Sequence, residues 1–515
     1  MKNLEKISQR YYKVILILIF LTALALRWYF LPQRNINFIF DQARDAFTVN
    51  EIVNGDLKIL GPPTSDGAGL HHGVLYYYLI TPAYLLGRGD PMFAAGYIGL
   101  INALAIIPVF YLTYLLTKKY YLSLIASFLF AFSFDAIQFS SFISNVSLGI
   151  LFIPMLFVGL YLWITKKTKF APVITGLFLG LSVQSDIAFL YYFIPVLIWL
   201  FVVRKSLKIG EIFLFLASFV FAVSTMIIAE VLFGFPAFKG ISYLFSGDNQ
   251  VLKTATLAHV SKTLFMQIGE RFTNAIYPSG SLAVGIAGFG ALGYLLIKEF
   301  LDKKTKSFRV RFISSYLLAH AVTIPFGGSI TPYIMVGVIP AVSIFLAMLL
   351  GDIFEKKKTL LLISVFILAL LNFSSLISKK NGPNPDYFTD KYLLSKELAV
   401  IDYTYQKANG KPFSISTLTA PLYINTLWSY LYNWYGQQKY GYVPYWVGRD
   451  QIGQLGNNLK SPPDDLEKHF FIQEPSEAIP DIWETYARGD QESISTVVEE
   501  KRFGGMTVEE RIIRK

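Results

Sequence analysis

Long apolar stretches separated by short polar segments fill the first 378 residues of the chain. A helix needs roughly 20 predominantly apolar residues to cross the hydrocarbon of a bilayer, and about eleven stretches approach that length. The predicted spans are residues 14–31, 91–116, 120–137, 142–164, 171–186, 189–203, 209–234, 278–297, 312–327, 333–351 and 359–378. The pattern therefore predicts a polytopic α-helical membrane protein.

One further apolar segment, residues 74–86, is shorter than a span and contains Pro82. An additional span here would invert every later loop, so the distribution of basic residues decides between a span and a surface helix. With the segment on the surface, the loops assigned to the cytoplasm hold 21 Lys and Arg, against eight in the outer loops 32–90 and 235–277. This bias predicts a cytoplasmic N-terminus and an interfacial helix whose tyrosine rings lie at headgroup level.

Composition supports the membrane assignment, because 54% of the residues are hydrophobic and only 16% are charged. The net charge of +11 falls in short basic clusters between apolar runs. That placement follows the positive-inside rule and argues against nucleic acid as a partner. The chain has no cysteine, so disulfides and thiolate metal sites are excluded.

The chain changes character after residue 378. Helical patterns at 391–407 and 422–438 alternate with short apolar strands at 413–418 and 469–472. We expect two domains: a transmembrane catalytic module at 1–378, and an extracytoplasmic soluble domain at 379–515 with α/β or α+β packing.

A short acidic cluster follows the first span, in the sequence Phe40-Asp41-Gln42-Ala43-Arg44-Asp45. If Asp41 opens a helix, Arg44 and Asp45 share its face, so two carboxylates and a guanidinium converge. The alternative is structural, with Asp41 capping the helix and Asp45 pairing with Arg44 on the surface. Transfer of a sugar to a hydroxyl needs a base near the acceptor and cations near a departing phosphate, and this loop offers both.

Further motifs follow in the same loop: Gly55-Asp56, Gly61-Pro62-Pro63 and His71-His72-Gly73-Val74-Leu75-Tyr76-Tyr77-Tyr78. With the acidic cluster, they make residues 10–350 similar to the GT-C glycosyltransferases, integral membrane enzymes that take sugars from polyprenyl-phosphate donors. Protein O-mannosyltransferases and lipid A aminoarabinose transferases belong to that family.

The resemblance implies that Asp41 is the catalytic base, with Asp45 as a second catalytic acid residue. Family members carry an Asp-Glu pair in the first outer loop, whereas Gln42 replaces the Glu here. This departure puts in doubt any role that needs adjacent acids, including metal binding. Gly73-Val74 likewise replaces the usual Pro-Pro or Gly-Pro.

Several cations are candidates for contact with the donor phosphate. Arg44 belongs to the acidic cluster, while His71 and His72 precede the aromatic helix where relatives often carry a polar or basic residue. A solvated histidine pair is the alternative, since neighbouring residues point to different faces of a helix. Arg271 ends an amphipathic stretch at 251–272 that we expect to lie on the membrane.

Four more side chains are candidates for the substrate cavity. Asp186 and Glu230 lie near the outer ends of predicted spans, where ionisable groups usually face a cavity, although interfacial solvation explains them equally well. Tyr77 belongs to the aromatic helix and Tyr333 begins the tenth span. No HxxxH or DxD spacing predicts a metal site, so no metal ligand is assigned; a divalent metal is possible, and no other cofactor is expected.

The sequence lacks Walker A, GxSxG, HExxH and Rossmann glycine motifs. This absence fits a donor that its phosphate linkage already activates. We therefore expect a hexosyl or pentosyl transferase of the plasma membrane that moves a sugar from a polyprenyl-phosphate donor to a hydroxyl acceptor, with inversion, at the outer face. A transporter or flippase, or a surface-polysaccharide ligase acting on lipid-linked saccharides, is the alternative.

Overall fold

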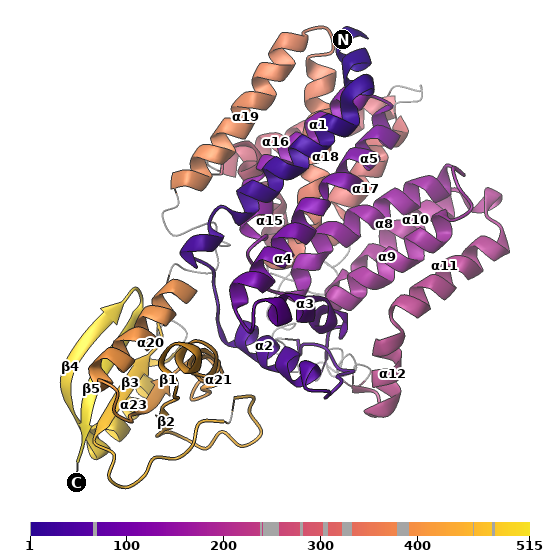
Figure 1. Ribbon diagram of the computed structural model, residues 1–515. Helices are drawn as coiled ribbons and strands as arrows, with labels where there is room; N and C mark the ends of the chain where they lie inside the picture. The colour runs from indigo at the N-terminus through magenta and orange to yellow at the C-terminus, as the bar shows by residue number, and fades with distance from the viewer. Residues whose placement is uncertain are drawn as a thin grey trace.

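The structure is a computed structural model that describes residues 2–64, 70–236, 239, 257–278, 282–301, 307–321, 332–378, 391–456, 458–475 and 479–514. A helical body carries a smaller sheet-containing domain at one end, and the N-terminus lies at the opposite end (Figure 1). Parts of two predicted segments, 240–256 of the second outer loop and 379–390 at the start of the tail, lie outside the described residues.

Every predicted span contains helix where the structure describes it. Among the described residues, five helices are long and apolar enough to cross a membrane, or six if one pair bent by 60° forms a single span. The five segments are α1 (Lys2–Trp28), α4 (Pro91–Leu104) with α5 (Ile106–Thr117), η2 (Asn145–Leu148) with α8 (Gly149–Ile164), η6 (Pro332–Val338) with α18 (Ile339–Ile353), and α19 (Lys358–Ser378). The bent pair is α11 (Ile209–Ala222) and α12 (Ser224–Leu232). The multi-pass helical body is thus confirmed, while the number eleven stays a prediction.

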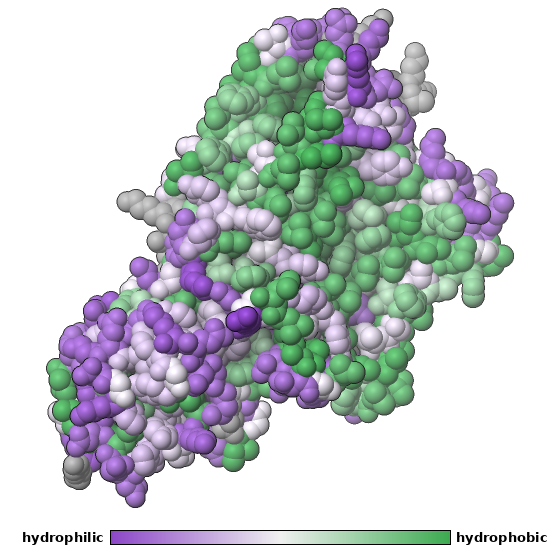
Figure 2. Space-filling model, in the orientation of Figure 1, coloured by the Kyte–Doolittle hydropathy of each residue, from purple (hydrophilic) through white to green (hydrophobic). Residues whose placement is uncertain are grey.

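The body also contains further helical segments among the described residues. They are α6 (Tyr120–Phe132), α7 (Phe134–Gln138), α9 (Ala171–Ser185), η3 (Ile187–Tyr192), α10 (Phe193–Val202), η4 (Arg204–Ser206), α15 (Leu257–Ile276), α16 (Leu282–Leu301) and α17 (Ser307–Leu317). Figure 2 shows an apolar surface over much of the body, with polar residues gathered at its two ends and on the small domain. This distribution matches a bilayer around the middle of the molecule.

Small residues set the close packing of the helices. A Cβ atom on Gly176 of α9 would lie 2.2 Å from the carbonyl oxygen of Phe215, and one on Gly180 would lie 2.5 Å from Cβ of Ala222. Glycines four residues apart share one helix face, so α9 and α11 approach each other along a small-residue seam.

The first outer loop folds into η1 (Leu31–Gln33) and the helices α2 (Phe40–Val53) and α3 (Leu75–Leu86). The predicted helix at 74–86 is therefore present, but the expectation that its rings sit among lipid headgroups is wrong for two of them. The side chains of Tyr76 and Tyr77 are buried in a core that α2, α3 and α4 share with the C-terminal domain. Packing of α3 against α2 outweighs the interfacial preference of these rings.

The C-terminal domain is a mixed sheet with helices, as the alternation of patterns predicted. Its strands have the order β2-β1-β3-β5-β4. They are β1 (Ser414–Leu418), β2 (Tyr445–Trp446), β3 (Lys468–Gln473), β4 (Ser495–Phe503) and β5 (Met506–Ile513). β1 runs parallel to β2 and β3, whereas β5 is antiparallel to β3 and β4. The helical segments are α20 (Leu394–Ala408), α21 (Thr426–Leu431), the π-helical turn η7 (Tyr432–Gly436), α22 (Gln437–Tyr440) and α23 (Asp481–Ile494).

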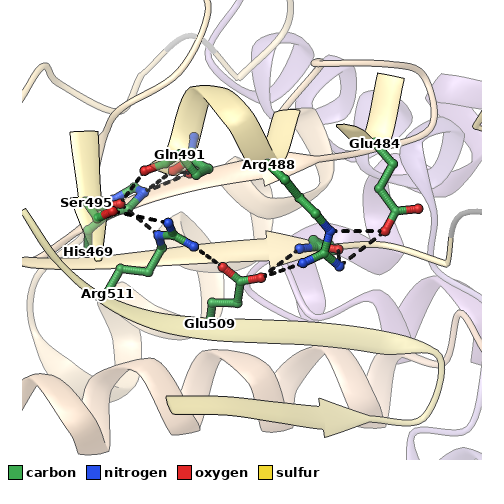
Figure 3. A network of polar contacts seen from close by, with 9 residues as sticks. His469, Glu484, Arg488, Gln491, Ser495, Glu509 and Arg511 are labelled. Atoms are coloured by element: carbon green, nitrogen blue, oxygen red, sulfur yellow. Dashed lines mark hydrogen bonds and ion pairs between the residues drawn. The ribbon is translucent and has the colours of Figure 1, made fainter. Parts of the chain in front are cut away.

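A polar network joins this sheet to α23 (Figure 3). His469 on β3 lies 2.8 Å from Oε1 of Gln491, and Arg511 donates to Oγ of Ser495 at 2.7 Å. Arg511 also pairs with Glu509, which accepts a second bond from Arg488 at 2.9 Å. Because these buried groups satisfy one another, α23 is held to the sheet in one register.

The C-terminal domain packs on the first outer loop. The amide of Leu394 donates to the carbonyl of Ile36 at 2.9 Å, and the amide of Ser395 donates to the carbonyl of Arg34 at 3.0 Å. The hydroxyl of Tyr430 donates to the carbonyl of Gly89 at 2.6 Å. The soluble domain thereby covers α2, the helix that carries the acidic cluster.

Candidate active site

The acidic cluster forms the first turn of α2. The helix begins at Phe40, and the side chain of Gln42 accepts a hydrogen bond from the amide of Ile39 at 3.1 Å. Gln42, where relatives carry Glu, thus closes the N-terminal turn, and Asp41 does not cap it. The expected sharing of one face by Asp41, Arg44 and Asp45 is confirmed.

Arg44 bridges the two carboxylates. Its Nη1 donates to Asp41 at 2.8 Å, while its Nε and Nη2 donate to Asp45 at 3.1 and 2.8 Å. The Asp41 side chain is 56% exposed, against 3% for Asp45 and 15% for Arg44. The structural alternative of a surface pair is therefore wrong for Asp45, which is buried beneath the guanidinium.

Asp45 is held in an environment that disfavours its charge. Burial raises the pKa of the Asp45 carboxyl to about 6, although the Arg44 guanidinium opposes that shift. The hydroxyl of Tyr77, on α3, donates to Asp45 at 3.3 Å. Asp45 thus titrates near the range in which an enzyme works, which is common for groups in functional sites.

A second acid and a histidine lie on the other side of the site. Nδ1 of His72 is 3.5 Å from a carboxylate oxygen of Asp186 and accepts the amide of Ile187 at 3.2 Å. Asp186 precedes η3 and accepts the amide of Ala188 at 2.9 Å. The histidine is therefore fixed against the start of η3.

A glycine brings this part of the first loop to α9. The amide of Gly73 donates to the carbonyl of Gln184 at 2.9 Å, and a Cβ atom on Gly73 would lie 1.7 Å from the Gln184 side-chain oxygen. Only glycine allows so close an approach, so the glycine at position 73 has a packing reason.

These groups surround one cavity of about 480 Å³. Six of the predicted site residues line it: Asp41, Arg44, Asp45, His72, Asp186 and Tyr333. The first outer loop also contributes Pro62, Pro63 and Thr64. These six residues come from four separate segments of the chain.

Other lining residues were missed. Ser144, Asn145 and Val146 come from the start of η2, while Ala420 and Pro421 come from the loop after β1 of the C-terminal domain. The Ala420 amide donates to the Glu474 carboxylate at 3.0 Å, which ties this loop to the end of β3. No local signal marks Ala420, although Thr419-Ala420-Pro421 after an apolar strand is typical of a turn.

The other predicted residues do not line this cavity. Tyr77 lies behind Asp45, and His71 forms a β-bridge with Pro63 next to it. Arg271 on α15 is buried in an ion pair with Asp135 at 2.8 Å, and Glu230 lies on α12. The roles assigned to these four side chains stay predictions.

The cavity is rich in negative charge. Three carboxylates, those of Asp41, Asp45 and Asp186, and one guanidinium, that of Arg44, are among its described lining residues. Within the described parts of the chain, no three His, Cys, Asp or Glu side chains converge closely enough to hold a metal ion. The possible divalent metal stays a prediction. The arrangement suits a catalytic base, Asp41, whose negative charge is stabilised by the neighbouring guanidinium of Arg44.

The chain as a whole is similar to ArnT from Cupriavidus metallidurans, solved with undecaprenyl phosphate bound, with a TM-score of 0.56, 10% identity, and coverage of 96% of this chain and 97% of ArnT. It also aligns with the apo oligosaccharyltransferase of Archaeoglobus fulgidus (TM-score 0.42, 14% identity, 84% of this chain and 64% of that one). A third alignment is with the mycobacterial arabinofuranosyltransferase AftD (TM-score 0.40, 13% identity, 97% of this chain and 40% of that one). This chain spans less than two thirds of the last two proteins. No family model and no curated protein matches it by sequence.

The chain therefore shares its fold with ArnT. The likeness to ArnT extends over nearly the full length of both chains, so it includes the C-terminal domain as well as the helical body.

Proposed function

We propose that the protein is a glycosyltransferase that moves a sugar from a polyprenyl-phosphate donor to a hydroxyl acceptor at the outer face of the membrane. One observation carries the proposal: the exposed carboxylate of Asp41 and the guanidinium of Arg44, 2.8 Å apart, line a single cavity with His72. A base and cations in one cavity are what such a transfer requires. The GT-C fold adds support, since ArnT was solved with a polyprenyl phosphate bound.

The reaction follows from these positions. The Asp41 carboxylate accepts the proton of the acceptor hydroxyl as the oxygen attacks the anomeric carbon. The bond from that carbon to the phosphate oxygen breaks, and the phosphate leaves with the electron pair. Arg44 and His72 stabilise the charge that develops on the phosphate. A single displacement of this kind inverts the anomeric carbon.

Asp45 has a different task in this scheme. Its carboxylate holds the Arg44 guanidinium through two nitrogens, so Arg44 cannot turn wholly toward Asp41. The carboxylate of Asp41 then stays accessible from the cavity, where the acceptor binds. His71 is proposed to contact the anionic donor at the edge of the cavity, whereas Arg271 is buried in its pair with Asp135 and is given no part in binding the donor.

The bias of basic residues supports the proposed orientation, with the N-terminus cytoplasmic. The N-terminus and the C-terminal domain lie at opposite ends of the molecule (Figure 1). The cavity and the C-terminal domain then belong to the extracytoplasmic side of the plasma membrane.

The test is transfer of radiolabel from polyprenyl-phosphate hexoses and pentoses by the full chain in proteoliposomes. Asp41→Asn is expected to lower transfer by about 10²- to 10⁴-fold with donor binding retained, because general-base catalysis contributes about that much. Asp56→Asn is a matched control, since Asp56 lies in the same loop, pairs with Lys58 and does not line the cavity. Undiminished transfer by Asp41→Asn would refute the role of the base, and movement of intact donor across the bilayer without transfer would favour a flippase.

A further inference from the structure

A second cavity lies between the first outer loop and the C-terminal domain. Its volume is about 370 Å³, and α2, the turn between α3 and α4, α21 and η7 surround it. The chemistry proposed above does not use this cavity.

The lining combines aromatic rings with amide side chains. Phe47, Tyr84, Tyr430 and Trp434 supply the rings, and Asn50, Asn433, Gln438 and Asn458 supply the amides. Arg88 is the one ionised side chain among the described lining residues. Apolar faces of a sugar ring pack on aromatic rings, while its hydroxyls both donate and accept hydrogen bonds, as amides do.

We propose that this interdomain cavity binds a neutral or weakly anionic saccharide. This part of the proposal rests on the proposed function: the saccharide is the part of the acceptor glycan that lies distant from the reacting hydroxyl. A lipid tail fits the lining less well, because four amides would lose their hydration without gaining hydrogen bonds.

The aromatic wall is preorganised. The rings of Tyr430 and Trp434 stack at 6.3 Å, and Phe47 meets Tyr430 edge-on at 5.3 Å. The bond from Tyr430 to the Gly89 carbonyl fixes the first ring against the α3–α4 turn. Gly89 has a φ of +87° and a Cβ there would lie 3.0 Å from Trp434, so the turn approaches the indole closely. A rigid wall of this kind binds without the entropic cost of ordering it.

Part of the amide capacity is available to a ligand. The Asn50 side chain is exposed and makes no hydrogen bond with the described residues. Asn433 donates to the carbonyl of Ser429 at 2.7 Å, and no described residue donates to its side-chain oxygen. Gln438 donates to the carbonyl of Arg88 at 3.0 Å, which leaves its oxygen for a hydroxyl.

The helix α2 relates the two cavities. Asp41, Arg44 and Asp45 line the first, whereas Phe47 and Asn50 line the second. At about 1.5 Å of rise per residue, Asn50 lies roughly 13 Å along the axis from Asp41. Nine residues also place Asp41 and Asn50 on opposite sides of α2, so a saccharide in the second cavity anchors a remote unit of the acceptor, not the reacting hydroxyl.

Binding is measured with the full chain in detergent micelles, by saturation-transfer NMR and tryptophan fluorescence, against a panel of neutral tri- and tetrasaccharides of hexoses and pentoses. We expect at least one probe to bind with a Kd near the millimolar range. Asn50→Ala and Phe47→Leu should each weaken that binding about fivefold, the effect of one lost hydrogen bond or ring contact. Asn54→Ala, at the exposed end of the same helix and outside the cavity, should bind as the wild type does.

Absence of binding by every probe, or binding that Asn50→Ala and Phe47→Leu leave unchanged in proteins with wild-type melting temperatures, would overturn the inference. Displacement of the saccharide by phospholipid alone would assign the cavity to lipid and also overturn it. Cleavage of the polyprenyl-phosphate donor by the wild-type protein is measured separately. If donor cleavage fails while saccharide binding responds to the two variants, the proposed function fails and the saccharide site stands.

Discussion

Turnover should depend on pH through Asp45, the buried partner of Arg44. Protonation of Asp45 removes the charge that holds two nitrogens of Arg44. The guanidinium then pairs with Asp41 alone and competes with the acceptor hydroxyl for that carboxylate. Acidification through the pKa of Asp45 therefore lowers turnover.

The size of the effect follows from the pKa of about 6 for Asp45. At pH 5 about one tenth of the molecules carry the Asp45 carboxylate, so turnover should be about tenfold below its plateau at pH 7.5. Folding stability has the opposite trend. Folding raises the pKa of the Asp45 carboxyl from 3.8 to about 6, so the protonated carboxyl contributes its full share of the folding stability below pH 3.8. That contribution is lost as the pH rises through 6. Asp45→Asn lacks this pH-dependent contribution. Its free energy of unfolding should therefore rise by about 2 kcal/mol relative to that of the wild type between pH 4 and pH 7.

The assay is initial-rate transfer from a polyprenyl-phosphate sugar at half-unit steps from pH 4.5 to 8, with thermal unfolding followed in the same buffers. Asp45→Asn should transfer at least tenfold more slowly at pH 7.5 and lose the transition near pH 6. Glu397→Gln is the control and should keep the transition near pH 6, since burial also raises the pKa of the Glu397 carboxyl but this residue does not line the cavity. A wild-type profile that is flat from pH 5 to 7.5, or a transition near 6 that persists in Asp45→Asn, would refute the reasoning.

Three other perturbations test different parts of the structure. Arg271→Ala should lower the melting temperature by removing the ion-pair partner of the buried Asp135 carboxylate, at a cost of about 3–5 kcal/mol. Asp135→Asn should lower it less, because Arg271 keeps its pair with Glu270; equal melting temperatures for both variants and the wild type would contradict a buried pair. Burial lowers the pKa of His469 to about 4, so the C-terminal domain should lose about 3 kcal/mol of stability as the pH falls from 6.5 to 4, and denaturation of His469→Gln should lack that slope. Glu474→Ala frees the amide of Ala420 at the cavity wall and should raise the KM for the acceptor more than it changes donor binding; an unchanged KM would separate this loop from the site.

Much of the fold was predictable from the sequence, because the length of an apolar stretch and helical periodicity are local properties. The strands at 413–418 and 469–472 were found for the same reason, and they are β1 and β3. The hairpin of β4 and β5 was missed. Its strand β4 is exposed along most of its length and rich in charge, so it lacks the apolar run by which a strand is recognised, although Gly504-Gly505 marks its turn.

The acidic cluster was predictable for a similar reason. Residues three and four apart on a helix must share a face, so the convergence of Asp41, Arg44 and Asp45 needed only a helix start near residue 40. The burial of Asp45 was not predictable, because Tyr77 of α3 covers it only after the chain has folded.

The sequence by itself determined which segments are helices and which loop carries the acids and cations. It also carries the motifs by which the chain resembles the GT-C glycosyltransferases. Each of these properties depends on residue type and spacing within a few turns. Only the tertiary structure decided that Ala420 and Pro421 complete the cavity, that Arg271 pairs with Asp135, and that a second cavity of rings and amides lies between the domains. Contacts between residues hundreds of positions apart depend on packing of the whole chain, and no local pattern records them.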